Sequence, residues 1–202
     1  MSDYPIYLDD NAPLTFTQRW NTYLAIVAVI AALTLGLTLR DNTLSATQTF
    51  EDLEAGVRAQ IPSGWLLDTE SEEYVFRAED PAALPFKTTL QVAIMPVGPD
   101  ATPGSVLDII KIQRSIRLST YREISRTEET LRDGSQAVRM KYAYTHDEPN
   151  PFLESQPLVV EGVDVVVLRR SQAVIITYRE ERSIFEDHLY RFENLLRTLE
   201  IF

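Results

Sequence analysis

The sequence contains no cysteine and only two histidines among its 202 residues. The missing thiols exclude disulfide bonds, thiolate nucleophiles and cysteine-ligated zinc or iron–sulfur clusters. The seven glycines stand singly, so none of them builds a glycine-rich phosphate loop, and no G-x-S-x-G turn presents a serine nucleophile. We therefore expect a protein that is not an enzyme, with no catalytic residues and no cofactor.

The two histidines give little support for a metal site. His146 is followed by Asp147 and Glu148, and a histidine beside acids at the edge of a loop is usually solvated. His188 falls in a predicted helix, on which the neighbouring Glu186 and Asp187 point in diverging directions. We expect no metal site, and we expect His188 to lie on the surface.

Basic residues are also outnumbered, with 19 lysines and arginines against 30 acids and a formal net charge of −11. A surface this acidic repels phosphate backbones and anionic headgroups, so we expect no nucleic-acid partner. Arginines do gather around one predicted helix, at Arg114, Arg117, Arg122 and Arg126. Arginines in such a position are usually solvated, although an acidic partner could also meet them.

One long apolar run lies near the N-terminus, from Trp20 to Leu39. As a helix, these 20 uncharged residues reach about 30 Å, the thickness of a bilayer's hydrocarbon core. A buried core helix would keep a polar stripe, and a cleaved signal peptide would have a basic start and a shorter apolar stretch. The run therefore predicts a single transmembrane helix over residues 20–40, in contact with a lipid bilayer.

The predicted helix carries two features that bear on its surroundings. Trp20 and Tyr23 stand near its first end, where aromatic side chains anchor helices at the membrane interface. Ala28, Ala32 and Gly36 recur every four residues, and a face of small side chains lets another helix approach closely. We predict a helix-packing interface there with integral membrane protein subunits, although alanine is common in any membrane helix.

The predicted helix divides the chain into an extra-membrane tail over residues 1–19, a linker over 41–55 and a domain over 56–202. Basic residues near the two helix ends nearly balance, so the positive-inside rule decides little. Because a short tail before one span and a large domain is the usual layout, we expect the domain on the periplasmic or extracytoplasmic side. The tail contains too few apolar residues to fold alone. Three of its side chains are candidates for contact with a partner: Tyr4, Ile6 and Tyr7.

Residues 56–202 alternate between strand and helix patterns. Apolar residues at every second position predict antiparallel strands, and spacings of three and four residues predict two helices, the first opening at Thr102 and Pro103 and the second capped by Ser183 with Glu186. The predicted strands cover residues 57–61, 72–80, 86–97, 121–131, 136–146 and 158–180, the last being two strands hinged near 169–172. Consecutive antiparallel strands with two segregated helices predict an α+β domain.

An ordered set of phrases resembles one superfamily. The set comprises "IPSGW" from Ile61, the aromatic strand at Tyr74, "TTLQVAIMPV", "LRDGSQAVRMKYAY", "VVEGVDVVV" followed by "AVIITY", and the final helix. It resembles the PsbP-like superfamily, which includes a photosystem II extrinsic protein, a Ran-binding nuclear-transport factor and bacterial lipoproteins. The resemblance implies an antiparallel sheet flanked by helices in an α/β/α sandwich, used mostly to bind proteins, with no shared catalytic residues.

Three functions are compatible with these features. The first is an accessory subunit of a larger membrane complex, as in photosynthetic or respiratory electron transport, acting through protein–protein contacts. The second is a membrane-tethered module that binds or senses a small ligand, with a pocket between sheet and helix lined by Trp65, Tyr142 and Tyr144. The third is an enzyme, for which the sequence offers no nucleophile and base. The first function is the one that we expect.

Overall fold

A computed structural model describes residues 15–44, 46–147 and 157–202. The chain separates into two compact units, Met1–Ala46 and Thr47–Phe202. The tail residues Tyr4, Ile6 and Tyr7 lie outside the described residues, so their contacts stay a prediction.

The first unit contains the helix α1 (Phe16–Leu44). Its segment Arg19–Leu39 has a mean hydropathy of 2.2, is not buried, and is long and apolar enough to cross a membrane. Two threonine hydroxyls within it bond to the helix's own backbone, since Thr34 Oγ1 donates to the Ile30 carbonyl at 3.0 Å and Thr38 Oγ1 to the Leu35 carbonyl at 2.9 Å. Polar groups satisfied in this way are compatible with a lipid environment.

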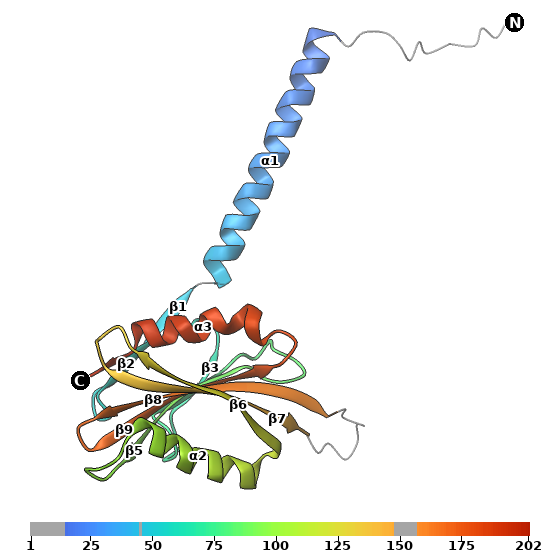
Figure 1. Cartoon of the computed structure of the whole chain (residues 1–202). Helices are drawn as coiled ribbons and strands as arrows, with labels where there is room; N and C mark the ends of the chain where they lie inside the picture. The colour runs from blue at the N-terminus through green and yellow to red at the C-terminus, as the bar shows by residue number, and fades with distance from the viewer. Residues whose placement is uncertain (1–14, 45, 148–156) are drawn as a thin grey trace, which may run out of the picture. The chain divides into compact units, whose positions relative to one another are not determined.

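The second unit is built from ten described strands and two helices (Figure 1). A seven-stranded antiparallel sheet has the order β3-β4-β5-β9-β8-β7-β6, and a smaller sheet has the order β1-β2-β10. The strands are β1 (Thr47–Asp52), β2 (Val57–Pro62), β3 (Leu66–Asp68), β4 (Phe76–Glu79), β5 (Thr89–Pro96), β6 (Ser119–Thr130), β7 (Gln136–His146), β8 (Leu158–Arg169), β9 (Gln172–Glu181) and β10 (Glu200–Ile201). The helices are α2 (Pro103–Arg117) and α3 (Phe185–Thr198).

The two helices cover opposite faces of the large sheet (Figure 1). Strands β8 and β9 are central and buried on both faces, so their successive side chains enter two different cores. Val165 of β8 joins the core under α3 and β2, with Phe192, whereas Val166 joins the core under α2, with Leu107. The predicted antiparallel sheet flanked by helices is therefore confirmed.

The predicted start of α2 is confirmed, but the predicted cap of α3 is wrong. Thr102 Oγ1 accepts from the Ser105 backbone N–H at 3.1 Å, and the Ser105 hydroxyl accepts from the Thr102 backbone N–H at 3.0 Å. This reciprocal capping box fixes the first turn of α2. At α3 the N-cap is Ile184, with no side-chain cap bond, because the Ser183 hydroxyl donates instead to Glu181 Oε1 at 2.7 Å.

The structure also differs from the predicted linker over residues 41–55. Residues 47–52 form β1, which pairs antiparallel with β2 from Thr47↔Pro62 to Asp52↔Val57. Phe50 of β1 contacts the ring of Phe76, with ring centroids 4.7 Å apart. The polar sequence of β1 hides this strand, because only one of its residues enters the core.

We expect a truncated chain beginning at Thr47 to fold, and one beginning at Ala55 to be less stable by about 1–2 kcal/mol, because it loses the burial of Phe50. Chemical denaturation of both truncated chains, followed by circular dichroism, measures the difference. Equal unfolding midpoints would show that β1 contributes nothing to the domain's stability.

Candidate functional site

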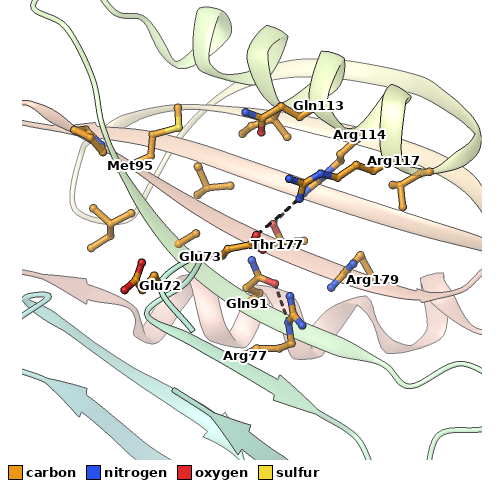
Figure 2. Close-up of a pocket in the computed structure, with 16 residues that line it drawn as sticks. Glu72, Glu73, Arg77, Gln91, Met95, Gln113, Arg114, Arg117, Thr177 and Arg179 are labelled. Carbon is orange, nitrogen blue, oxygen red and sulfur yellow. Dashed lines mark hydrogen bonds and ion pairs between the residues drawn. The ribbon is translucent and has the colours of Figure 1, made fainter. Parts of the chain in front are cut away.

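A cleft of about 690 Å³ lies between α2 and the sheet (Figure 2). Its floor consists of side chains from β4, β5 and β9, its wall is the second half of α2, and its rim includes Glu72 and Glu73 from the segment before β4. It is open to solvent on one side, because α2 contacts β6, β7 and β8 and leaves part of β5 and β9 uncovered.

The helix α2 is fixed to the sheet by an apolar face and by ion pairs. Val106, Leu107 and Ile110 are buried against the sheet. On the side of β6, Lys111 Nζ lies 2.7 Å from Glu123 Oε2, and an Arg126 Nη lies 2.9 Å from Asp108 Oδ1. The expectation that Arg126 is solvated is therefore wrong. These contacts make α2 a fixed wall for the cleft.

Strand register places a row of polar side chains across the floor. Arg77 of β4 is opposite Gln91 of β5, Gln91 is opposite Thr177 of β9, and Thr177 is opposite Asp164 of β8. Because directly opposed residues of antiparallel strands share a face, all four lie on the α2 side of the sheet. Residues that are 87 positions apart in sequence are thereby joined in one row, which no local motif announces.

Arg114 reaches down from α2 to the end of this row. Its guanidinium forms a two-pronged ion pair with the fully buried carboxylate of Asp164, one of whose bonds measures 2.8 Å. Thr177 Oγ1 donates to the same carboxylate at 2.7 Å, and the guanidinium carbon lies 4.4 Å from the centroid of the Tyr142 ring. The expectation that Arg114 is solvated is therefore wrong, because its charge is paired and stacked inside the fold.

The surroundings of this pair set its protonation. Burial disfavours the charge on Arg114, but the adjacent Asp164 carboxylate, together with Tyr142 and Tyr121, raises the pKa of Arg114 overall. Burial raises the pKa of the Tyr142 phenol, and the nearby Arg114 charge offsets only part of that rise. At neutral pH the arginine is a cation and the tyrosine is neutral, so Arg114 and Asp164 cancel each other's charge.

Three other arginines of the cleft are less neutralised. Arg77 Nε donates to Gln91 Oε1 at 3.0 Å, as Figure 2 shows. Arg179 of β9 has a buried Nε without a hydrogen-bond partner among the described residues. Arg117 is 74% exposed and lies 3.9 Å from the equally exposed Glu73. The cleft thus holds positive charge in a strongly acidic chain.

The other end of the cleft is apolar. Ala93 and Met95 of β5, Ile175 of β9 and Ile110 of α2 line it. They follow directly from strand alternation, since Gln91, Ala93 and Met95 occupy successive positions on one face of β5. The cleft therefore changes along its length from cationic to apolar.

The pocket predicted from Trp65, Tyr142 and Tyr144 does not exist as one site. Trp65 is buried in the core under α3, whereas Tyr142 and Tyr144 are buried in the core under α2. The sheet separates them. Alternation within β7 places Tyr142 and Tyr144 on one face, but it gave no signal about the face that Trp65, just before β3, would occupy, and that ambiguity explains the error.

The expectation of a surface role for His188 is also wrong. Its Nδ1 lies 2.9 Å from Oε1 of Glu180, a carboxylate that is almost fully buried. The same carboxylate accepts from Thr88 Oγ1 at 2.6 Å and from the Tyr178 hydroxyl. This network ties the start of α3 to the sheet, and its function is structural because every partner is satisfied within the fold.

The structure shows where His146 and the predicted residues of α1 lie, and their predicted roles stay predictions. His146 stacks edge-on against Phe86, with ring centroids 5.1 Å apart. Among the described residues no group of three histidines or acids could hold a metal ion. Within α1 the predicted anchors and the predicted packing face are all exposed, namely Trp20, Tyr23, Ala28, Ala32 and Gly36.

Comparison with solved structures decides the fold. A cyanobacterial PsbP from Synechocystis sp. PCC 6803 superposes with a TM-score of 0.59 at 14% identity, covering 78% of this chain and 94% of that one. The domain has the PsbP-like fold. LpqN of Mycobacterium tuberculosis, involved in cell envelope biogenesis, matches with a TM-score of 0.52 at 14% identity, covering 77% of this chain and 90% of LpqN.

A third protein with the PsbP-like fold is the Ran-binding protein Mog1p of Saccharomyces cerevisiae. It matches with a TM-score of 0.51 at 9% identity, covering 77% of this chain and 95% of Mog1p. No protein-family model and no curated protein matches the sequence. At these identities the likeness establishes the fold alone, because one fold hosts many functions.

Proposed function

We propose that the protein is a single-pass, membrane-anchored accessory subunit that presents its PsbP-like domain to a larger membrane complex and acts through protein–protein contacts. The apolar helix α1 is the anchor, the domain lies on the extracytoplasmic side, and the partners are integral membrane subunits. A complex of photosynthetic or respiratory electron transport is the first place to look, by analogy with PsbP.

The observation that carries this proposal is an apolar stripe on the outer face of α2. Ile109, Ile112 and Ile116 are 47%, 61% and 80% exposed. Their spacing of three and four residues places them on one side of the helix, along the border of the buried face that contains Val106 and Ile110. Neighbouring apolar side chains on an otherwise charged surface are typical of protein interaction sites.

Charge substitution on the stripe is expected to release the protein from its complex. Native membranes carrying Ile112→Glu together with Ile116→Glu should give a faster-migrating species on a native gel after mild detergent extraction. Ile124→Glu is the matched control, because Ile124 is a half-exposed isoleucine on β6, outside the stripe. A wild-type chain that migrates alone at its own mass would refute the accessory-subunit proposal.

The small-residue face of α1 is expected to contribute to the same assembly. Ala28→Leu and Gly36→Leu should each weaken co-migration with the complex, because a larger side chain keeps a partner helix from approaching closely. Leu33→Ala, within the same helix, is the control and should leave co-migration unchanged. If all three variants co-migrate like the wild type, α1 acts only as an anchor.

A second candidate function is small-ligand binding, and the cleft favours it. Ligand sites in proteins are typically concave, about 300–1,000 Å³ in volume, and lined by apolar side chains with a few polar groups. The cleft beside α2 agrees with this description in its volume and in its apolar end, whereas the rest of its lining is polar or charged. Thermal unfolding of the purified chain with and without a small organic-anion library tests it, with an increase in unfolding temperature as the expected result.

A further inference from the structure

Two arginines in the cleft differ from the other half-buried arginines of the described chain. Arg77 and Arg179 have no carboxylate within 4.0 Å among the described residues, whereas the remaining half-buried arginines are all ion-paired. Those paired residues are Arg114, Arg126, Arg139, Arg169 and Arg191. In a chain with so many acids, two partly desolvated arginines without an ion pair are unusual.

Strand register brings the two arginines to the same part of the cleft. Arg77 belongs to β4 and Arg179 to β9, the two neighbours of β5, and both lie on the face covered by α2. Gln91 of β5 is directly opposite both Arg77 and Thr177 of β9, and its amide adds a hydrogen-bonding group beside the arginines. Guanidinium groups and amides in one concave site form a suitable binding surface for carboxylate or phosphate oxygens.

The acids near the cleft form no ion pair with these two arginines; Asp68 of β3, directly opposite Arg77, accepts instead from the Tyr74 hydroxyl. Asp164 is already bound to Arg114, while Glu73 is exposed at the rim beside Arg117. Glu72 is likewise exposed at the rim. The orphaned Nε of Arg179 is a further donor without an acceptor, and such a buried group is unfavourable unless something pairs with it.

The apolar end specifies the rest of the ligand. Ala93, Met95 and Ile175 continue the floor away from the arginines, and Ile110 continues the wall. A small inorganic anion would leave this apolar surface exposed to water, whereas an apolar group joined to the anion would bury it.

From this arrangement we infer that the cleft binds an organic anion, a carboxylate or phosphate group joined to an apolar body, with the anion held by Arg77 and Arg179. The inference deepens the second candidate function and is independent of the accessory-subunit proposal. Ligand binding is measured on the purified protein, without a partner complex. Either proposal can therefore fail while the other holds.

The test uses the full chain in phosphatidylcholine nanodiscs and isothermal titration calorimetry. Octanoate and octyl phosphate are the two probes, with 1-octanol, octyltrimethylammonium and inorganic phosphate as controls, and empty nanodiscs are titrated to subtract partitioning. We expect saturable one-to-one binding of at least one octyl anion, at least tenfold tighter than any control. Absence of saturable binding by both octyl anions would overturn the inference.

Variants locate the binding. Arg77→Gln and Arg179→Gln should each weaken binding by about tenfold or more, as expected for loss of a charge-assisted bond. Arg132→Gln removes an exposed arginine outside the cleft and should have no effect. Ala93→Leu retains both arginines but fills the apolar end, so it should weaken octyl anions while leaving inorganic phosphate unchanged. If all four variants bind the octyl anions as tightly as the wild type does, the cleft is refuted as the binding site.

The source of the anion is resolved by lipid composition. Repeating the titration in nanodiscs that contain phosphatidylglycerol shows whether an anionic headgroup competes. If phosphatidylglycerol abolishes octyl-anion binding, and no Ala93 or arginine variant restores it, the site is assigned to a bilayer headgroup. If binding is unchanged, the site is assigned to a soluble ligand. This comparison follows only after binding that depends on Arg77 and Arg179 has been measured in phosphatidylcholine nanodiscs.

Discussion

Asp164→Ala is expected to lower the free energy of unfolding by about 3–5 kcal/mol, because it leaves the Arg114 charge partly buried without a partner. The carboxylate is fully buried, and it also accepts the Thr177 hydroxyl at 2.7 Å. Urea denaturation monitored by circular dichroism measures the loss. The substitution should also shift α2, since Arg114 is the ion-paired contact of that helix with the central strand β8.

A double variant separates pairing from packing. Arg114→Met with Asp164→Val replaces both charges by apolar side chains, and such replacements of buried pairs are often neutral or stabilising. We therefore expect the double variant to be more stable than Asp164→Ala alone. A single-variant loss below about 1 kcal/mol would mean that Arg114 turns to solvent, as surface arginines do.

Gly162→Ala is expected to lower the free energy of unfolding by about 2–3 kcal/mol through overpacking. Gly162 of β8 is directly opposite Tyr142 of β7, and the tyrosine ring lies across it. A Cβ at Gly162 would come within 2.3 Å of Cζ of that ring, so the ring would have to move. Tyr142 is fully buried and stacks on Arg114, so it has little room to do so.

Two comparisons isolate this effect. Gly98→Ala is the control, because a Cβ at Gly98 meets nothing within 4 Å. In a Tyr142→Leu background the cost of Gly162→Ala should fall, since the ring that causes the clash is absent. A Gly162→Ala protein as stable as Gly98→Ala would show that Tyr142 repacks freely, and the wall of the cleft would then be less rigid than its contacts indicate.

Most of the fold was predictable because its signals are local. The helix α2 follows from Thr102 and Pro103 together with apolar residues at helical spacing. The strand β7 follows from alternation between Ala137 and His146. The strand β1 was missed, because a polar strand at the edge of a small sheet has no periodicity that a sequence window can detect.

The candidate site was not predictable in the same way. Arg77 and Arg179 are ordinary polar positions of alternating strands, and Arg114 resembles a surface arginine of an amphipathic helix. Each sequence window is compatible with a solvated side chain. Their meeting depends on the strand order β4-β5-β9-β8, which joins segments distant along the chain.

The sequence by itself determined the apolar run of transmembrane length, the acidic charge, the absence of thiol chemistry and the order of strands and helices. These properties depend on composition or on neighbouring residues, which the chain alone specifies. Tertiary structure alone decided that Arg114 is ion-paired within the fold and Glu180 is buried, that Trp65 and Tyr142 lie in different cores, and that a cleft runs from cationic to apolar beside α2. Burial and pairing depend on long-range strand register and on which face each side chain takes, and only the assembled sheet fixes both.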